Sequence, residues 1–230
     1  MLKKINNKLF LFLALFLVAT TNVYAAKTIR IGIVFDGPIK RELLPLNLIK
    51  KEIKELTSGE FDVIFPEDKV LYGDWKIDGI ETALQSLLND PEIDLLITNG
   101  LVASHQAAQI DKLNKPVIAP IVADRVLQDL PYKEGVSAKH NYVYITDNHT
   151  VEEDLRQFYQ LKKFKHLAIP VDQLFLKALP ELKGTTYNVQ QELGFEISML
   201  PVVDSPAQTL EDISSDVDAV YVPPLFRFSE

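Results

Sequence analysis

Residues 94–124 read DLLITNGLVASHQAAQIDKLNKPVIAPIVAD, and this stretch decides the fold class. The apolar run at 94–98 predicts a buried strand, and the Asn-Gly pair at 99–100 leads into an alanine-rich helix over 101–113. A second strand is predicted over 116–121. A strand, a crossover helix and another strand in succession are typical of a βαβ unit in a parallel sheet.

Short apolar runs alternate with longer amphipathic stretches on both sides of this unit. Strands are predicted over 28–35, 61–65 and 142–145, and helices over 43–56 and 80–88. Leucine and isoleucine recur every three or four residues in both helices, which gives each helix an apolar face. The side chains expected to face the core are Leu44, Leu48, Ile49, Ile53 and Leu56 in the first helix, and Ile80, Leu84, Leu87 and Leu88 in the second.

A polar break at residues 147–150 predicts a boundary between two α/β lobes. Thr150 is placed to cap the next helix, and Glu153 stands where it completes a capping box. The predicted lobes are residues 26–147, with five strands, and residues 148–230, with three.

The second lobe continues the same alternation. Its predicted strands are 166–171, 195–203 and 219–222. The stretch 172–194 is predicted to be helical, with interruptions at Pro180 and Gly184. Ser205 and Pro206 predict the start of a further helix, because serine suits the cap and proline suits the first helical position.

Residues 1–25 have the three parts of a cleavable secretory signal. Three lysines precede an unbroken apolar run at 9–19, and Val23-Tyr24-Ala25 offers small side chains for cleavage after Ala25. The alternative is an uncleaved membrane anchor, but 11 apolar residues rise only ~16 Å as a helix, against a hydrocarbon core of ~30 Å. We therefore expect export to the periplasm and no membrane insertion after signal cleavage.

Composition excludes several classes of function. The chain has 24 basic and 32 acidic side chains, and three of the lysines belong to the predicted signal, so the remainder carries a net charge of −11 (21 less 32). Such an acidic body repels phosphate backbones, and we expect no nucleic-acid partner. Cysteine is absent and the four histidines have no ligand spacing, so no metal site and no cofactor are predicted.

Candidate binding residues follow from the rule that ligands bind at the carboxyl ends of parallel strands. Applied to the predicted strands and the polar loop around the single tryptophan, this rule selects Asp36, Gly37, Trp75, Asn99, Gly100, Leu101, Ser104, Pro120, Asp172 and Pro223.

Asn99-Gly100 is the strongest of these candidates. Free backbone amides of the following helix would suit a carboxylate, and Ser104 could add a hydroxyl, although the pair is equally compatible with a simple turn. Trp75 could line a cleft or cover the core, and Asp36 could bind a ligand or cap the turn before Pro38.

Signatures of catalysis are missing from the sequence. It contains no GxGxxG after the first strand, no GxxxxGK[ST] and no GxSxG. The acidic run at 152–154 is more simply explained by the helix N-terminus than by paired catalytic carboxylates. We therefore predict no enzymatic activity.

Several strings taken in order resemble the substrate-binding proteins of ABC transporters with the type I periplasmic-binding fold. They are the IGIV run at 31–34, DLLITNG at 94–100, KPVIAPIVAD at 115–124, Asn141-Tyr142, and DAVYVPPL at 218–225. The resemblance implies two parallel-sheet lobes that close on a small molecule, and a membrane permease as partner. It covers nearly all of residues 27–230.

Two departures from that family pattern affect the expectations. Leu101 stands where many relatives have a threonine or serine, so a hydroxyl contact is not expected there. Relatives also run to about 300 residues, which implies that the second lobe here is incomplete. The leading hypothesis is a periplasmic solute-binding protein. The alternatives are a sensor or accessory module of an envelope export system, and an enzyme on the same α/β scaffold.

Overall fold

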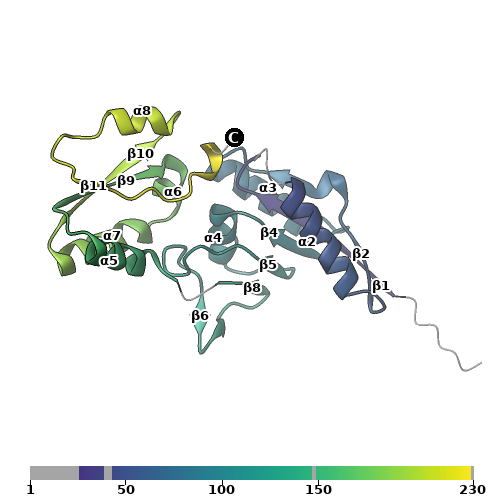
Figure 1. The fold of residues 1–230 in the computed structure, drawn as a ribbon. Coiled ribbons are helices and arrows are strands. Elements are labelled where there is room, and N and C mark those ends of the chain that lie inside the picture. The colour runs from purple at the N-terminus through teal and green to yellow at the C-terminus, as the bar shows by residue number, and fades with distance from the viewer. Residues whose placement is uncertain (1–25, 39–42, 147–148, 229–230) are drawn as a thin grey trace, which may run out of the picture.

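The computed structural model describes residues 26–38, 43–146 and 149–228 (Figure 1). The predicted signal at 1–25 and the first half of the predicted lobe boundary, residues 147–148, lie outside the described residues. Within the described ranges, no helix combines the length and the apolar character that a bilayer crossing needs.

The first lobe is built on a parallel sheet with strand order β2-β1-β4-β5-β8. Its strands are β1 (Lys27–Phe35), β2 (Phe61–Ile64), β3 (Val70–Tyr72), β4 (Leu95–Thr98), β5 (Val117–Ala119) and β8 (Tyr142–Tyr144). Strands β2 and β3 share one edge of β1: β2 pairs with residues 27–30 and β3 with residues 33–35. The short 3-10 helix η1 (Glu67–Lys69) lies between them.

Alternate residues of β1 enter two separate hydrophobic cores. Ile31, Ile33 and Phe35 pack on the side of α2 (Leu43–Leu56), whereas Val34 packs on the side of α3 (Ile77–Asn89) and α4 (Leu101–Gln109). The predicted core face of α3 is confirmed, since Ile80, Leu84, Leu87 and Leu88 are all buried. Helices on both faces explain why the strands are apolar without alternation.

The predicted core face of α2 is wrong in part. Leu48 and Leu56 are 53% and 81% exposed, and Leu46 is buried instead. Leu46 and the partly buried Ile53 are seven residues apart, on one line of the helix, and they contact the core around Val63. Because α2 buries so narrow a stripe, leucines to either side of that line face solvent. The side chain of Leu44 lies outside the described part.

The second lobe contains a parallel sheet with strand order β10-β9-β11. Its elements are α5 (Val151–Leu161), β9 (His166–Asp172), α6 (Gln173–Ala178), α7 (Glu181–Leu193), β10 (Glu196–Val202), α8 (Pro206–Glu211), β11 (Ala219–Val220) and η2 (Phe226–Phe228). The Thr150 cap is confirmed: its hydroxyl accepts a hydrogen bond from the Glu153 amide at 3.3 Å. After β11 the chain passes from the second lobe toward the first (Figure 1).

The predicted interruption at Pro180 is confirmed, whereas the one at Gly184 is wrong. Helix α7 runs through Gly184 and ends at Gly194, whose φ of 73° is the left-handed conformation that favours glycine at a helix end. A glycine inside a helix costs about 1 kcal/mol relative to alanine and need not break it. Leu161, at the last position of α5, is 87% exposed.

Three short strands were not predicted from the sequence. These strands are β3 and the two strands of a hairpin, β6 (Tyr132–Lys133) and β7 (Val136–Ser137). Two or three residues are too few to display a periodic pattern. Helix α4 ends at Gln109 rather than Leu113, and Leu113 packs into the core from the loop that follows.

Candidate functional site

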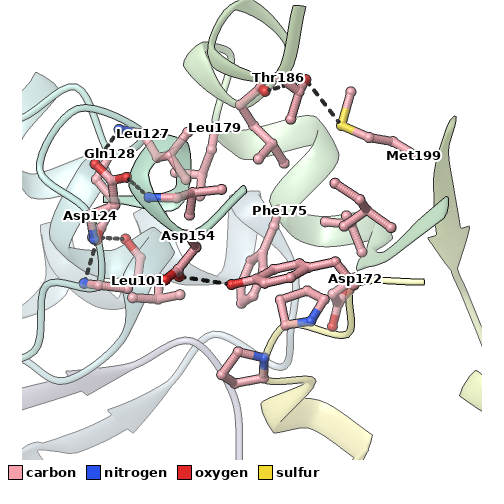
Figure 2. Close-up of a pocket in the computed structure, with 18 of the residues that line it drawn as sticks. Leu101, Asp124, Leu127, Gln128, Asp154, Asp172, Phe175, Leu179, Thr186 and Met199 are labelled. Atoms are coloured by element: carbon pink, nitrogen blue, oxygen red, sulfur yellow. Dashed lines mark hydrogen bonds between the residues drawn. The ribbon is translucent and has the colours of Figure 1, made fainter. Parts of the chain in front are cut away.

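A cavity of about 200 Å³ lies between the two lobes. Figure 2 shows Asp124, Leu127 and Gln128 together on one side and Asp172 and Phe175 on the other. The segment after β11 supplies a third wall. The apolar side chains that line the cavity are Leu101, Ala123, Leu127, Val151, Ile169, Val171, Phe175, Leu179, Leu182, Met199, Pro223, Pro224, Leu225 and Phe226.

Asp124 joins the first lobe to the start of α5. One carboxylate oxygen accepts hydrogen bonds from the amides of Val126 and Leu127, at 2.8 and 3.1 Å. The other accepts from the amide of Val151 at 2.9 Å. The side chain is buried, so these three bonds replace the water that the carboxylate would otherwise bind.

Gln128 and Tyr221 order two further parts of the wall. The Gln128 side chain accepts from the amide of Ala123 at 3.0 Å and donates to the carbonyl of Leu101 at 3.1 Å. The Tyr221 hydroxyl donates to Asp154 at 2.9 Å. Burial and, after it, this bond to Asp154 raise the pKa of Tyr221 to about 12, so the hydroxyl keeps its proton at neutral pH.

Among the described side chains that line the cavity, Asp172 is the one carboxylate with a buried oxygen that accepts no hydrogen bond. Its Oδ1 accepts from the amide of Leu174 at 2.9 Å, which caps α6. Its Oδ2 is buried and accepts no hydrogen bond. The nearest cation is Arg227, whose Nε lies 3.4 Å from Oδ2, an ion-pair distance without hydrogen-bond geometry.

The helix amides predicted to bind a ligand are already occupied, and the prediction that they are free is wrong. The buried carboxylate of Asp36, at the end of β1, accepts hydrogen bonds from Val102 at 3.1 Å and from Ala103 at 2.7 Å. Burial raises the pKa of Asp36 to about 6, against the opposing effect of these amides, and the negative charge of Asp172 adds to the increase.

Gly100 is required where Asp36 meets α4. A Cβ added at this position would stand 2.3 Å from the Asp36 Oδ1, and the carboxylate is held by two amides and cannot retreat. We expect Gly100→Ala to lower the free energy of unfolding by about 2 kcal/mol through overpacking. Urea unfolding measures this change. Gly184→Ala is the matched control, because its Cβ meets only Glu181 at 3.7 Å, and equal losses in both variants would contradict the explanation.

The other predicted site residues fall into two groups. Leu101, Asp172 and Pro223 line the cavity. The remaining candidates are not among the residues that line the cavity. They are Asp36, Gly37, Trp75, Asn99, Gly100, Ser104 and Pro120.

Trp75 and Ser104 illustrate this supporting role. The Trp75 ring packs over Gly37, where an added Cβ would meet it at 2.4 Å, so the ring covers the core at the end of β1. Ser104 is fully buried, and its hydroxyl donates to the carbonyl of Gly100 at 2.7 Å rather than pointing to a cleft. The predicted hydroxyl contribution of Ser104 to the cleft is therefore wrong.

Sequence reasoning missed most of the apolar wall. Phe175, Leu179 and Leu182 come from α6 and α7, and Met199 comes from the middle of β10. The strand-end rule selects only residues just after strands, and apolar residues on a helix carry no sign that they face a cavity rather than a core. Throughout the residues that the structure describes, no group of three or more His, Asp or Glu side chains is placed to hold a metal ion.

Two parallel α/β lobes with a cavity between them are the architecture of type I periplasmic binding proteins, and solved structures confirm this fold. The ABC domain in complex with L-Trp from Streptococcus pneumoniae matches with a TM-score of 0.60 and 16% identity, over 86% of this chain. A solute-binding protein of an ABC transporter from Rhodopseudomonas palustris BisB5, in complex with 3,4-dihydroxy benzoic acid, matches with a TM-score of 0.53 and 14% identity, over 85% of this chain.

A third match is an ABC transporter substrate-binding protein from Desulfitobacterium hafniense in complex with Leu, with a TM-score of 0.51 and 15% identity over 85% of this chain. The chain spans 65% of the Streptococcus structure, 54% of the Rhodopseudomonas structure and 58% of the Desulfitobacterium structure. No protein-family model and no curated protein matches the sequence.

Proposed function

We propose that this protein is a periplasmic solute-binding component of an ABC transporter, which captures a small molecule between two lobes, residues 26–147 and 148–230. The observation that carries the proposal is the cavity of about 200 Å³ walled by both lobes and by the returning segment. A volume of this order accommodates a small molecule, since an apolar cavity of about 150 Å³ admits benzene.

The arrangement of the chain supports lobe closure as the working motion. Residues 149–151 and 221–226 both pass between the lobes and both line the cavity. Rotation about these crossings would open the cavity and close it around a ligand. In the proposed function, a membrane permease recognises the closed form. The signal at residues 1–25 directs export, and the function requires no cofactor or nucleic acid.

Similar proteins support the choice of a small ligand. The three solved structures hold tryptophan, leucine and dihydroxybenzoate, each small enough to be enclosed between two lobes. A sensor or accessory module of an export system would use the same cavity and the same closure. Binding assays therefore test the capture step that both functions share, and a permease-dependent uptake assay separates them.

A Ser–His–Asp cluster is the feature that favours the enzyme alternative. The ring nitrogens of His166 lie 2.8 Å from the Ser198 hydroxyl and 2.9 Å from the Asp216 carboxylate. This cluster sits at the amino end of β9, whereas Asp172 at the carboxyl end lines the cavity, about 20 Å away along the strand. The cluster joins β9, β10 and the loop before β11, and we assign it a structural role.

A variant that fills the cavity tests solute capture. Ala123 is exposed on a loop and lines the cavity, so Ala123→Trp places a large ring there with little cost in stability. Amino acids, sugars, nucleosides and aromatic amines are first screened by thermal shift on the wild-type protein. We expect Ala123→Trp to weaken the best compound at least about 100-fold, or about 2.7 kcal/mol.

Ala138→Trp is the matched control, because Ala138 is also an exposed loop alanine but does not line the cavity. We expect the control to bind as the wild type does. Unchanged binding in Ala123→Trp, or equal loss in both variants, would place the ligand outside this cavity and contradict the proposal.

A further inference from the structure

Building on the proposed function, we propose that the cavity selects a primary amine with an apolar or aromatic body, and that it discriminates against compounds of the same shape that carry a carboxylate. The proposal rests on the charges that line the cavity and on the hydrogen bonds that each charged group already makes.

Negative charge dominates the cavity wall. The described lining residues include the carboxylates of Asp124, Asp154 and Asp172, and none of those lining residues is a lysine or an arginine. A buried ligand carboxylate would lose its hydration and meet three carboxylates, of which Asp172 alone has a described arginine within ion-pair distance, so its entry is disfavoured. A ligand ammonium group meets the opposite field.

Among the three lining carboxylates, Asp172 is the one with a buried oxygen that accepts no hydrogen bond. Asp124 accepts three backbone amides, and Asp154 accepts the Tyr221 hydroxyl and lies 2.6 Å from the His149 ring. Asp172 is among the residues that line the cavity, and its Oδ2 is buried and accepts no hydrogen bond. A buried acceptor without a donor is costly, so a donor brought by a ligand would be bound strongly.

Arg227 shows which kind of group this oxygen attracts. Its Nε stands 3.4 Å from the Asp172 Oδ2, too poorly placed for a hydrogen bond. The same guanidinium also donates to the carbonyl of Val203 and stacks on the Phe228 ring, 4.5 Å from its centroid. Because these contacts hold Arg227 independently of Asp172, a ligand ammonium can form the shorter charge-assisted bond that Arg227 does not make.

The positive site that would favour a carboxylate is closed. The amides at the start of α4 are the natural anion site of such a fold, and Asp36 occupies them from within the protein. Most of the remaining lining residues are apolar, and Ile169, Val171 and Phe175 are among them. The cavity thus combines apolar walls with three carboxylates, of which Asp172 has an oxygen without a hydrogen bond.

A matched series of compounds on one phenyl ring tests the proposal by isothermal titration calorimetry on the wild-type protein. The series is 2-phenylethylamine, phenylalanine, 3-phenylpropionate and uncharged 2-phenylethanol. We expect the amine to bind at least tenfold more tightly than phenylalanine and the alcohol, and the propionate to give no measurable binding. Equal or tighter binding of phenylalanine or the propionate would overturn the proposal.

Two variants assign the preference to Asp172. We expect Asp172→Asn to weaken the amine at least tenfold while 2-phenylethanol binds as before, a result that a merely structural role would not produce. Arg227→Gln removes the competing cation and should strengthen amine binding. Binding of the alcohol without any amine preference contradicts this inference alone, whereas failure of all four compounds contradicts capture of ring-sized ligands as well.

Discussion

Asp124→Ala is expected to lower the free energy of unfolding by about 4 kcal/mol, because it leaves the amides of Val126, Leu127 and Val151 without their acceptor in a buried position. It also removes the link between the loop after β5 and the start of α5, so ligand binding should be lost with it. Urea unfolding followed by the fluorescence of Trp75, the single tryptophan, measures the effect.

Two further variants make this prediction specific. Asp111→Ala changes an exposed aspartate just after α4 and should alter stability by less than about 0.5 kcal/mol. Asp124→Asn keeps an oxygen for the bonds within the loop but loses the bond to Val151, and we expect an intermediate loss of about 2 kcal/mol. If Asp124→Ala proves no worse than Asp111→Ala, the carboxylate does not hold the two segments together.

The second large effect is a fall in stability with rising pH that originates at Asp36. Burial raises the pKa of this carboxyl from 3.8 to about 6 in the folded protein. Well below pH 3.8 both states hold the proton. Between pH 4 and pH 6 the unfolded chain releases it while the folded protein retains it, so stability falls. Above pH 6 the loss levels off at about 3 kcal/mol, the free energy equivalent of this pKa difference.

Asp36→Asn isolates that contribution, since an amide does not titrate and still offers one oxygen to α4. We expect the difference in unfolding free energy between Asp36→Asn and the wild type to shift by about 2.5 kcal/mol in favour of the variant between pH 4 and pH 7. Asp111→Asn serves as the control and should follow the wild-type profile. A constant difference across this range would show that Asp36 ionises normally in the folded protein.

The order of elements was predictable because it depends on local patterns. Residues 31–35 of β1 and 95–97 of β4 are apolar without alternation, and four apolar residues of α3 repeat at helical spacing, so burial and element type could both be inferred. The Thr150 cap was likewise predictable, because a capping box is confined to four neighbouring residues. The exposed leucines of α2 were not, since a helix pattern does not reveal how wide a stripe its neighbours cover.

The candidate site was harder to predict, as Asp36 and Asp172 illustrate. Both were selected by the strand-end rule. The Asp36 carboxylate accepts hydrogen bonds from the amides of α4, whereas the Oδ2 of Asp172, a residue that lines the cavity, accepts none. Their different surroundings come from segments distant in the sequence: α4 reaches Asp36, and Arg227 reaches Asp172. No local pattern encodes those meetings.

The sequence by itself determined the α/β class, the parallel strands and the order of helices and strands, because periodicity, caps and glycine or proline act over a few residues. Only the tertiary structure decided which carboxylate faces the cavity, which amides are already occupied and which apolar side chains form a wall rather than a core. These properties depend on the packing of segments far apart in the chain, such as Asp36 and Ala103, which are separated by 67 residues. Burial and the choice of hydrogen-bond partner exist only once that packing is complete.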